Sequence, residues 1–533
     1  MDSLQRVLDK RWRNTCKVVF GEDAGPLSEY EVWLRGLIQT PKYRKSSVSG
    51  KEIAYSTFEY QDGSKWIGFD EVNFNKKFEP LSINDMKDID SLAESIQERV
   101  LYAGNIILGN SAYVEKSSNI SDSFYMYETG ILTDCKYLAY CNFGRQNEDL
   151  FGTHAPGESS FCIRCTQTVR LKRGFEAWNC INSSDCYYSY NLIDCNECFF
   201  CFNLKNRRHS IGNLGLERTK YLGIKRKLLS EITQELKSKK RLPSLLELVG
   251  RSRERMPGVE LSSEESNEES NREPMERAFS NTTGLVLGKQ LKGIEEYSAW
   301  LKKHTRTIKE YNSAISGKRI LSIPIILSVP PIPEERTITL SEGAKFGELA
   351  SLGKEDVEAI SMSNVHEKIG RIAYFVVDAL VGENSNLIDC TYCLSSVNCY
   401  RSSAPVYSKN CGYTFWPRTC SDLFGCDSML DSSFSINCYF SVKLTRCLEM
   451  DACRDCSDSY FSHNCENVRD SMFCFNSKNL RRAVGNVELP RDKYESVKSS
   501  LLSQISEELG RTGDFGWDIY NIGAGKRRQR TKP

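Results

Sequence analysis

The chain has 533 residues, of which 71 are basic, 70 are acidic and 22 are cysteines. This length exceeds what one hydrophobic core normally serves, so we expect two or more domains. The balanced charge excludes a strong overall field that would select nucleic acid, a membrane surface or an acidic substrate.

The N-terminal segment, 1–110, lacks the features of a targeting signal. Its first residues, MDSLQRVLDKRWRNTC, contain no apolar run of the kind found in secretory signals. The most apolar stretches, 323–333 and 371–382, are too short to cross a bilayer. We therefore expect a cytoplasmic protein that does not contact membranes, with reduced cysteines that pack as small apolar side chains. Segment 1–110 itself is predicted to form an N-terminal α/β module.

A period of three residues dominates segment 111–213. Every cysteine in the chain except Cys16 lies at a position divisible by three. An α-helix would show a period of 3.6 and a strand a period of 2, whereas a 3₁₀-helix rarely persists beyond a turn. Motifs also recur after twelve residues, as in DCYYS (185–189) and ECFFC (197–201). These spacings predict a narrow β-solenoid with about twelve residues per coil and one inward side chain per triplet.

The corners of such a tube need residues that tolerate a left-handed backbone. Asparagine or aspartate often precedes the inward residue, for example Asn179 before Cys180 and Asp194 before Cys195. Because the interior is thin, only serine, cysteine, alanine, threonine and an occasional leucine or valine should fit inside.

Segment 214–250 is predicted to hold a helix, near 217–238, that caps the last coil and protects an exposed sheet edge. Segment 251–285 contains the polar, acidic run SSEESNEESNREPMER. Such a run buries too little surface to offset its ordering entropy, so we predict a flexible acidic linker. The alternative is a functional acidic patch.

The rest of the chain repeats the first half. The segments CFNLKNRRHSIGNLGLERTKY (201–221) and CFNSKNLRRAVGNVELPRDKY (474–494) are identical at twelve of 21 positions, with an offset of 273. EYEVWL (29–34) likewise parallels EYSAWL (296–301). The sequence is therefore a tandem duplication.

The second half is predicted to follow the same plan as the first. It would comprise an α/β module at 286–383, a β-solenoid at 384–486, and a capping helix with a basic tail at 487–533. Each module is expected to cover the N-terminal end of its own solenoid. The predicted fold class is thus mainly β with α, each half being a small α/β module plus a narrow β-solenoid capped by a C-terminal helix.

Two resemblances accompany these motifs. The ending CFFCFNLKNRRHSIGN (198–213), with Cys/Ser triplets before it and an amphipathic helix after it, resembles uncharacterised cysteine-rich triplet-repeat proteins of archaea and small-genome bacteria. Members of that group often open with paired CxxC zinc motifs, but this N-terminus has only Cys16, so a zinc ribbon is not implied. The group implies no established activity. The coil geometry is also similar to that of narrow insect-antifreeze β-helices.

CxxC pairs are the candidate metal ligands, since such pairs bind zinc or iron–sulfur clusters in other proteins. The period of three, however, produces CxxC wherever two adjacent inward positions are cysteine, and a narrow tube leaves little room for a tetrahedral metal. We expect no cofactor, with zinc or iron–sulfur as the alternative. The candidate residues are Cys162, Cys165, Cys195, Cys198, Cys390, Cys393, Cys453 and Cys456.

Aromatic residues one coil apart form the candidate partner-binding face. An outward aromatic row could stack bases or hold a protein, and the alternative is internal packing. The candidate residues are Tyr188, Phe200, Phe440, Phe461 and Phe473.

No P-loop, HExxH or GxSxG motif occurs, and no catalytic residue is predicted. The sequence favours a non-enzymatic scaffold or binding protein that presents rigid solenoid faces to a macromolecular partner, either another protein or a second copy. One alternative is a metal-binding or redox protein that uses the CxxC pairs. The other is a nucleic-acid- or ribosome-associated protein that uses the basic tail, 525–533.

Overall fold

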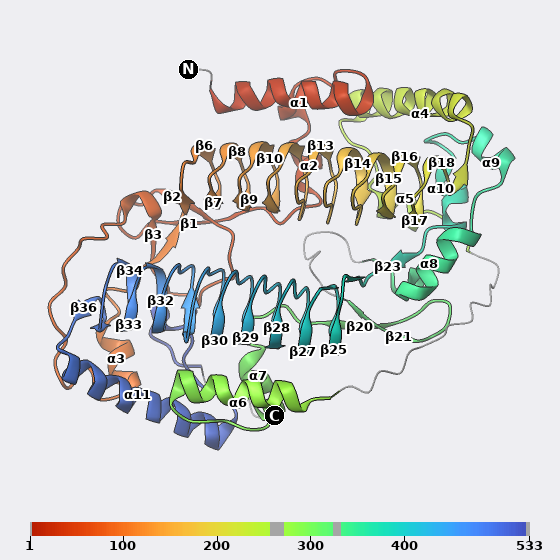
Figure 1. The fold of residues 1–533 in the computed structure, drawn as a ribbon. Coiled ribbons are helices and arrows are strands. Elements are labelled where there is room, and N and C mark those ends of the chain that lie inside the picture. The colour runs from red at the N-terminus through yellow and green to blue at the C-terminus, as the bar shows by residue number, and fades with distance from the viewer. Residues whose placement is uncertain (1–2, 256–270, 323–331, 529–533) are drawn as a thin grey trace.

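The computed structural model describes residues 3–255, 271–322 and 332–528. It shows a mixed α/β protein with two similar sheet-rich halves (Figure 1). Each half contains a stack of short parallel strands in which residue i pairs with residue i+12, as Cys186 does with Cys198. We call the stack formed by β5–β19 the first ladder and the stack formed by β24–β36 the second ladder. The two ladders lie side by side and run in opposite directions (Figure 1).

The first ladder has two strand rows. One row runs in the order β6-β8-β10-β12-β13-β14-β15-β16-β18-β19, with β17 paired to β15, and the other runs β11-β9-β7-β5. The strands are β5 (Ile107–Leu108), β6 (Ala112–Glu115), β7 (Ser118–Ser121), β8 (Phe124–Tyr127), β9 (Gly130–Thr133), β10 (Lys136–Ala139), β11 (Asn142–Arg145), β12 (Glu148–Phe151), β13 (Ser160–Ile163), β14 (Lys172–Trp178), β15 (Ser184–Ile193), β16 (Asn196–Phe199), β17 (Phe202–Lys205), β18 (Arg208–Ile211) and β19 (Leu214–Gly215).

The second ladder repeats this arrangement. Its main row runs in the order β25-β27-β28-β29-β30-β31-β32-β33-β35-β36, with β34 paired to β32, and β24 pairs with β26. The strands are β24 (Leu380–Val381), β25 (Ser385–Ile388), β26 (Cys393–Leu394), β27 (Val397–Tyr400), β28 (Lys409–Gly412), β29 (Ser421–Phe424), β30 (Ser433–Ile436), β31 (Leu448–Asp451), β32 (Ser457–Glu466), β33 (Arg469–Met472), β34 (Phe475–Lys478), β35 (Ala483–Val484) and β36 (Val487–Glu488).

The backbone of both ladders turns at every third residue. Each third residue has φ between 44° and 66°, from Tyr113 to Gly212 and from Asn386 to Gly485. This left-handed residue stands directly before a buried inward residue, as Asn179 does before Cys180. The apolar inward residues, with cysteine the most frequent, form one narrow cluster in each ladder, and small polar residues such as serine fill many of the other inward positions. The predicted period of three is therefore present in the backbone itself.

The interior side chains share one hydrogen-bonding role. Inward thiols and hydroxyls donate to the carbonyl oxygen two residues earlier, as Cys180 does to Trp178 and Ser183 does to Ile181. An inward serine also accepts the amide of the next repeat: Ser183 Oγ accepts from Cys195 N at 3.1 Å. Small polar side chains thus provide hydrogen-bond partners for the backbone carbonyls and amides of the ladder. A larger apolar side chain would not fit the interior and would leave those groups without partners.

Helices cover the outer flank of each ladder (Figure 1). In the first half, Trp12 packs on Phe151 with ring centroids 5.3 Å apart, and in the second half Phe279 packs on Phe424 at 5.2 Å. The helices are α1 (Leu4–Phe20), α2 (Glu31–Arg35), α4 (Arg218–Lys239) and α5 (Leu245–Gly250) in the first half, and α6 (Glu273–Leu287), α7 (Ser298–Leu301) and α11 (Arg491–Thr512) in the second.

The predicted acidic linker, 251–285, is wrong at its C-terminal end. Residues 273–287 form α6, whose residues Met275, Ala278 and Phe279 are buried. Their spacing of three and four residues is that of an amphipathic helix, a signal that the acidic run directly before it obscured. The rest of the predicted linker between 256 and 270 lies outside the described residues.

The small modules pack on the opposite half of the molecule. Residues of 53–102 share one hydrophobic core with the second half, and residues of 352–375 share the other core with the first half. Each module therefore contacts the C-terminal end of the other ladder, which the sequence prediction did not include. Each also contacts the start of its own ladder, as expected: residues 52–55 contact β7, and Arg319 lies 2.8 Å from Asp389. The first module holds β1 (Lys42–Lys45), β2 (Glu52–Tyr55), β3 (Trp66–Gly68), α3 (Ile89–Ser95) and β4 (Tyr102–Gly104). The second holds β20 (Lys309–Asn312), β21 (Arg319–Ser322), β22 (Thr337–Ile338), α8 (Leu340–Leu349), α9 (Lys354–Glu358), α10 (Val365–Lys368) and β23 (Phe375–Val376).

Equivalent hydrogen bonds join each module to the ladder of the other half. Asn203 Nδ2 donates to the carbonyl of Tyr374 at 2.9 Å, and Asn476 Nδ2 donates to the carbonyl of Leu101 at 2.7 Å. Both members of the second bond differ from those of the first by 273 positions. The duplicated halves are therefore related by an approximate twofold operation. Within the described residues, no helix has the length and apolar character needed to cross a membrane.

We expect that two separate chains, 1–255 and 271–533, are each unstable alone and form a stable complex when produced together. Alone, each chain leaves the C-terminal end of its ladder uncovered, so apolar side chains such as Phe202 and Phe475, both buried in the intact protein, become exposed. Size-exclusion chromatography and binding of a hydrophobic dye report this exposure. A monomeric half with a cooperative melt near that of the full chain would contradict the reciprocal packing.

Candidate functional site

The predicted thiol columns are aligned inside the ladders. Cys186 pairs in register with Cys198, and Cys399 pairs with Cys411. All described cysteines are free, and all are buried except Cys390, which is half-buried. Burial raises the pKa of the Cys135 and Cys420 thiols to about 11. These thiols are protonated donors at neutral pH rather than the thiolates that metals and redox chemistry require.

The candidate metal ligands lie in these columns. Each of the four CxxC pairs points into a ladder interior, where Cys162 Sγ donates to the carbonyl of Ser160 and Cys453 Sγ to that of Asp451. Among residues 3–255, 271–322 and 332–528, no three His, Cys, Asp or Glu side chains gather closely enough to hold a metal ion. The contacts fit packing, and the metal-binding alternative stays a prediction.

The candidate aromatic face is covered by the protein's own tail segments. Tyr188 and Phe200 are buried and stacked with centroids 5.7 Å apart, and the Tyr188 hydroxyl donates to the carbonyl of Pro243. In the second half, Phe461 and Phe473 are buried and stacked at 5.0 Å, beneath Phe515. These contacts fit the alternative of internal packing.

Phe440 lies on a different face from the other candidate rings. It is 21 residues before Phe461, which is not a multiple of the twelve-residue repeat, so the two rings cannot share a column. Phe440 is partly buried and contacts Phe58 of the first-half module, with centroids 5.5 Å apart.

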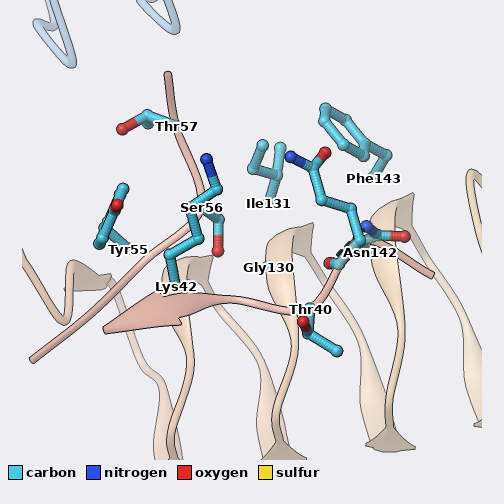
Figure 2. Close-up of a pocket in the computed structure, with 10 residues that line it drawn as sticks. Thr40, Lys42, Tyr55, Ser56, Thr57, Gly130, Ile131, Asn142 and Phe143 are labelled. Carbon is cyan, nitrogen blue, oxygen red and sulfur yellow. Dashed lines mark hydrogen bonds between the residues drawn. The ribbon is translucent and has the colours of Figure 1, made fainter. Parts of the chain in front are cut away.

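A shallow pocket lies where the strap formed by the segments before β1 and after β2 crosses the first ladder (Figure 2). Tyr55, Ser56 and Thr57 line one side, and Gly130 and Asn142 line the ladder side. Its free volume is about 250 Å³, part of it open to solvent, which is below the usual size of a small-molecule site. The strap approaches so closely that a Cβ at Gly130 would lie 2.3 Å from Ser56 Oγ. The pocket is therefore a packing seam.

Lys42, the cation at this pocket, is already paired. Its Nζ lies 2.8 Å from Glu59 Oε1. Asn142 is also engaged, because its Nδ2 donates to the carbonyl of Gln39. Neither side chain is left to bind a charged ligand.

A buried His–Asp pair joins the two halves. His463 Nδ1 lies 2.8 Å from Asp451 Oδ2, and the hydroxyl of Tyr60 donates to the same carboxylate. Burial, and then the charge of Asp451, raises the pKa of Tyr60 well above its ordinary value. The other ring nitrogen, Nε2, accepts the backbone amide of Ala103 at 2.9 Å. A histidine whose Nδ1 is bound to an aspartate would offer Nε2 to a substrate, but here Nε2 is occupied by the amide of Ala103. The pair therefore holds the first-half module in place.

The sequence prediction missed this pair. Asp451 and His463 are twelve residues apart and occupy adjacent repeats of one column. A search for ionisable residues at the twelve-residue spacing would have found them.

Two equivalent carboxylates hold the tail segments that follow α4 and α11. Glu176 and Glu449, 273 positions apart, are both buried, and each accepts a tail amide at 3.0 Å, from Leu245 and Ile519 respectively. Glu176 also accepts from the guanidinium of Arg164 at 2.6 Å. At the position equivalent to Arg164, the second half has Asn437, which donates to Glu449 at 3.0 Å.

The missing arginine changes the charge state of Glu449. Burial, followed by the charge of Asp518, raises the pKa of Glu449 to about 8. The folded protein therefore carries a proton on Glu449 at neutral pH, whereas an unfolded glutamate loses it near pH 4.3. The stability that this proton contributes is fully present below about pH 4 and is lost as the pH rises through about 8.

We expect Glu449→Gln to raise the free energy of unfolding at pH 8 by on the order of 3 kcal/mol and to flatten its pH dependence between pH 5 and pH 8. Glutamine is neutral, like the protonated carboxyl that it replaces. Asn437 Oδ1 receives no hydrogen bond within the described residues, and a half-turn of the Asn437 amide would let this oxygen accept from the new glutamine amide. Denaturant melts at several pH values measure the effect.

Glu176→Gln is the matched control and should act in the opposite direction. It leaves the buried Arg164 without its carboxylate and is expected to destabilise the protein by roughly 3–5 kcal/mol at every pH between 5 and 8. Equal effects of the two substitutions would contradict the assigned charge states.

Ellman's reagent is expected to react with fewer than two thiols per native chain and with all 22 after denaturation. Inward packing and protonation protect the thiols, and only Cys390 is half-buried. Zinc and iron are measured in the same sample. Stoichiometric metal that is released together with newly reactive thiols would support the metal-binding alternative instead.

Comparisons with known proteins give the chain no family. No family model and no curated protein matches it. A solved structure described as a putative acetyltransferase from Desulfovibrio desulfuricans G20 aligns with 99% of this chain and 98% of that chain, at 7% identity and a TM-score of 0.14. At that score the alignment supports no statement about fold or function.

Proposed function

We propose that each ladder is a narrow β-solenoid of twelve-residue coils and that the protein is a non-enzymatic scaffold that presents a rigid solenoid face to a protein partner. The register of i with i+12 and the left-handed corner at every third residue support the solenoid. The thiols, the aromatic columns and the His–Asp pair all have internal partners, so the available chemistry lies on the outer faces.

The observation that carries the scaffold role is a row of aliphatic side chains on the outside of the second ladder. Val381, Leu394 and Val406 follow one another in register on consecutive repeats. Val381 is 44% exposed, Leu394 and Val406 are half-buried, and Tyr407, next to Val406, is 62% exposed. A row of apolar side chains held at fixed spacing by backbone ladders offers a protein partner a flat, preorganised contact.

The reciprocal packing of the two halves supports the same role. Each module locks the ladder of the other half, so the outer faces keep a fixed relative position without a ligand. Rigidity of this kind lowers the entropy lost when a partner binds.

The test is affinity purification of the full chain from native cells under reducing conditions, with a salt wash, beside the double variant Val406→Asp/Tyr407→Asp. We expect a stoichiometric protein that the native chain retains and the double variant loses. Val48→Asp is the matched control, because Val48 is 63% exposed on the first module, away from the row. A native chain without any stoichiometric partner, or a partner retained by all three proteins, would overturn the proposal.

A further inference from the structure

Equivalent residues of the two halves meet between the ladders. Phe143 and Trp416, 273 positions apart, have ring centroids separated by 6.2 Å. Equivalent residues of two halves related by a twofold rotation can touch each other only near the rotation axis. These two rings therefore mark the position of that axis. Two residues further along each half stand Arg145 and Arg418, which are also equivalent.

Arg418 forms no ion pair within the part of the chain that the structure describes, although Asp431 lies near enough for its charge to act on the guanidinium. The guanidinium carbon of Arg418 lies 4.1 Å above the ring of Trp416, which fixes the plane of the group. Its Nε is buried and has no hydrogen-bond acceptor, and the side chain makes no ion pair with any residue in the described ranges. A buried guanidinium nitrogen without an acceptor costs free energy that an anionic ligand would offset.

Arg145 adds a second positive charge to the same place. Burial lowers the pKa of Arg418 to about 10. The positive charge of Arg145 also lowers this pKa, whereas the negative charge of Asp431 raises it. The carboxylate of Glu158 lies 3.5 Å from Arg145, but both of these side chains are largely exposed, so the pair is weak. Each arginine thus has one carboxylate nearby, Glu158 or Asp431, while Arg418 Nε still lacks an acceptor.

We propose that Arg145 and Arg418 together bind a small oxyanion, of the class of inorganic phosphate, on the twofold axis between the ladders. Planar guanidinium groups recognise tetrahedral oxyanions through paired N–H donors, and a site on the axis receives one arginine from each half. Arg418 follows Val406 in register on the next repeat, so the site adjoins the end of the aliphatic row, but the anion proposal does not depend on the scaffold role. No covalent step is involved.

The test compares thermal unfolding of the full chain in sodium phosphate and in sodium chloride at equal ionic strength. We expect a higher midpoint in phosphate, and a change in Trp416 fluorescence, because Arg418 stacks on that ring. Arg418→Gln and Arg145→Gln should each remove at least half of the phosphate-dependent shift. Calorimetric titration with inorganic phosphate should show one site per chain in the native protein.

Arg469→Gln is the matched control, because Arg469 is an exposed arginine at the start of β33, and it should keep the full shift. Both glutamine variants keep the folded state in chloride if their melts there match that of the native chain, which separates binding from stability. An equal shift in all four proteins, or no phosphate-dependent shift in the native chain, would overturn the proposal.

Discussion

The width of the ladder interior is the constraint on which the rest of the structure depends. One side chain in three points inward, and the residue before it must adopt a left-handed backbone, even where it is Ile131 or Thr419. Left-handed conformations are unfavourable for such residues, by roughly 1–2 kcal/mol each in a helical context. Continuous pairing of i with i+12 on both sides, and inward thiols and hydroxyls that bind the carbonyl two residues earlier, offset that strain.

An interior this thin cannot supply a conventional hydrophobic core. The large cores instead lie outside the ladders, where columns such as Phe151–Ile163–Phe175 meet helices and tail segments. The ladder ends would still expose apolar side chains and sheet edges. In the duplicated chain these ends are covered, because the module of each half packs on the C-terminal end of the other ladder. The two halves consequently stabilise each other.

The local geometry could be predicted from the sequence, and the long-range packing could not. The cysteine phase and the asparagines before inward residues indicate corners and an interior, because both follow from neighbouring positions. The exchange of modules depends on contacts such as Asn203 with Tyr374, which no spacing reveals. Helix α6 was hidden by the acidic run before it. The His463–Asp451 pair was predictable in principle from its twelve-residue spacing, whereas its role depends on the amide of Ala103, 360 positions away.

The differences between equivalent buried positions show which interactions the fold requires. Both halves keep a carboxylate that holds the tail, but only the first half pairs it with an arginine. His463 receives the amide of Ala103, while Tyr190, its equivalent, donates to the carbonyl of Val376, the residue equivalent to Ala103. The contact between module and ladder is thus retained while its chemistry changes from acceptor to donor. A catalytic group could not be exchanged in this way without loss of its reaction, whereas a structural clamp can, and this favours a structural role for the buried polar residues.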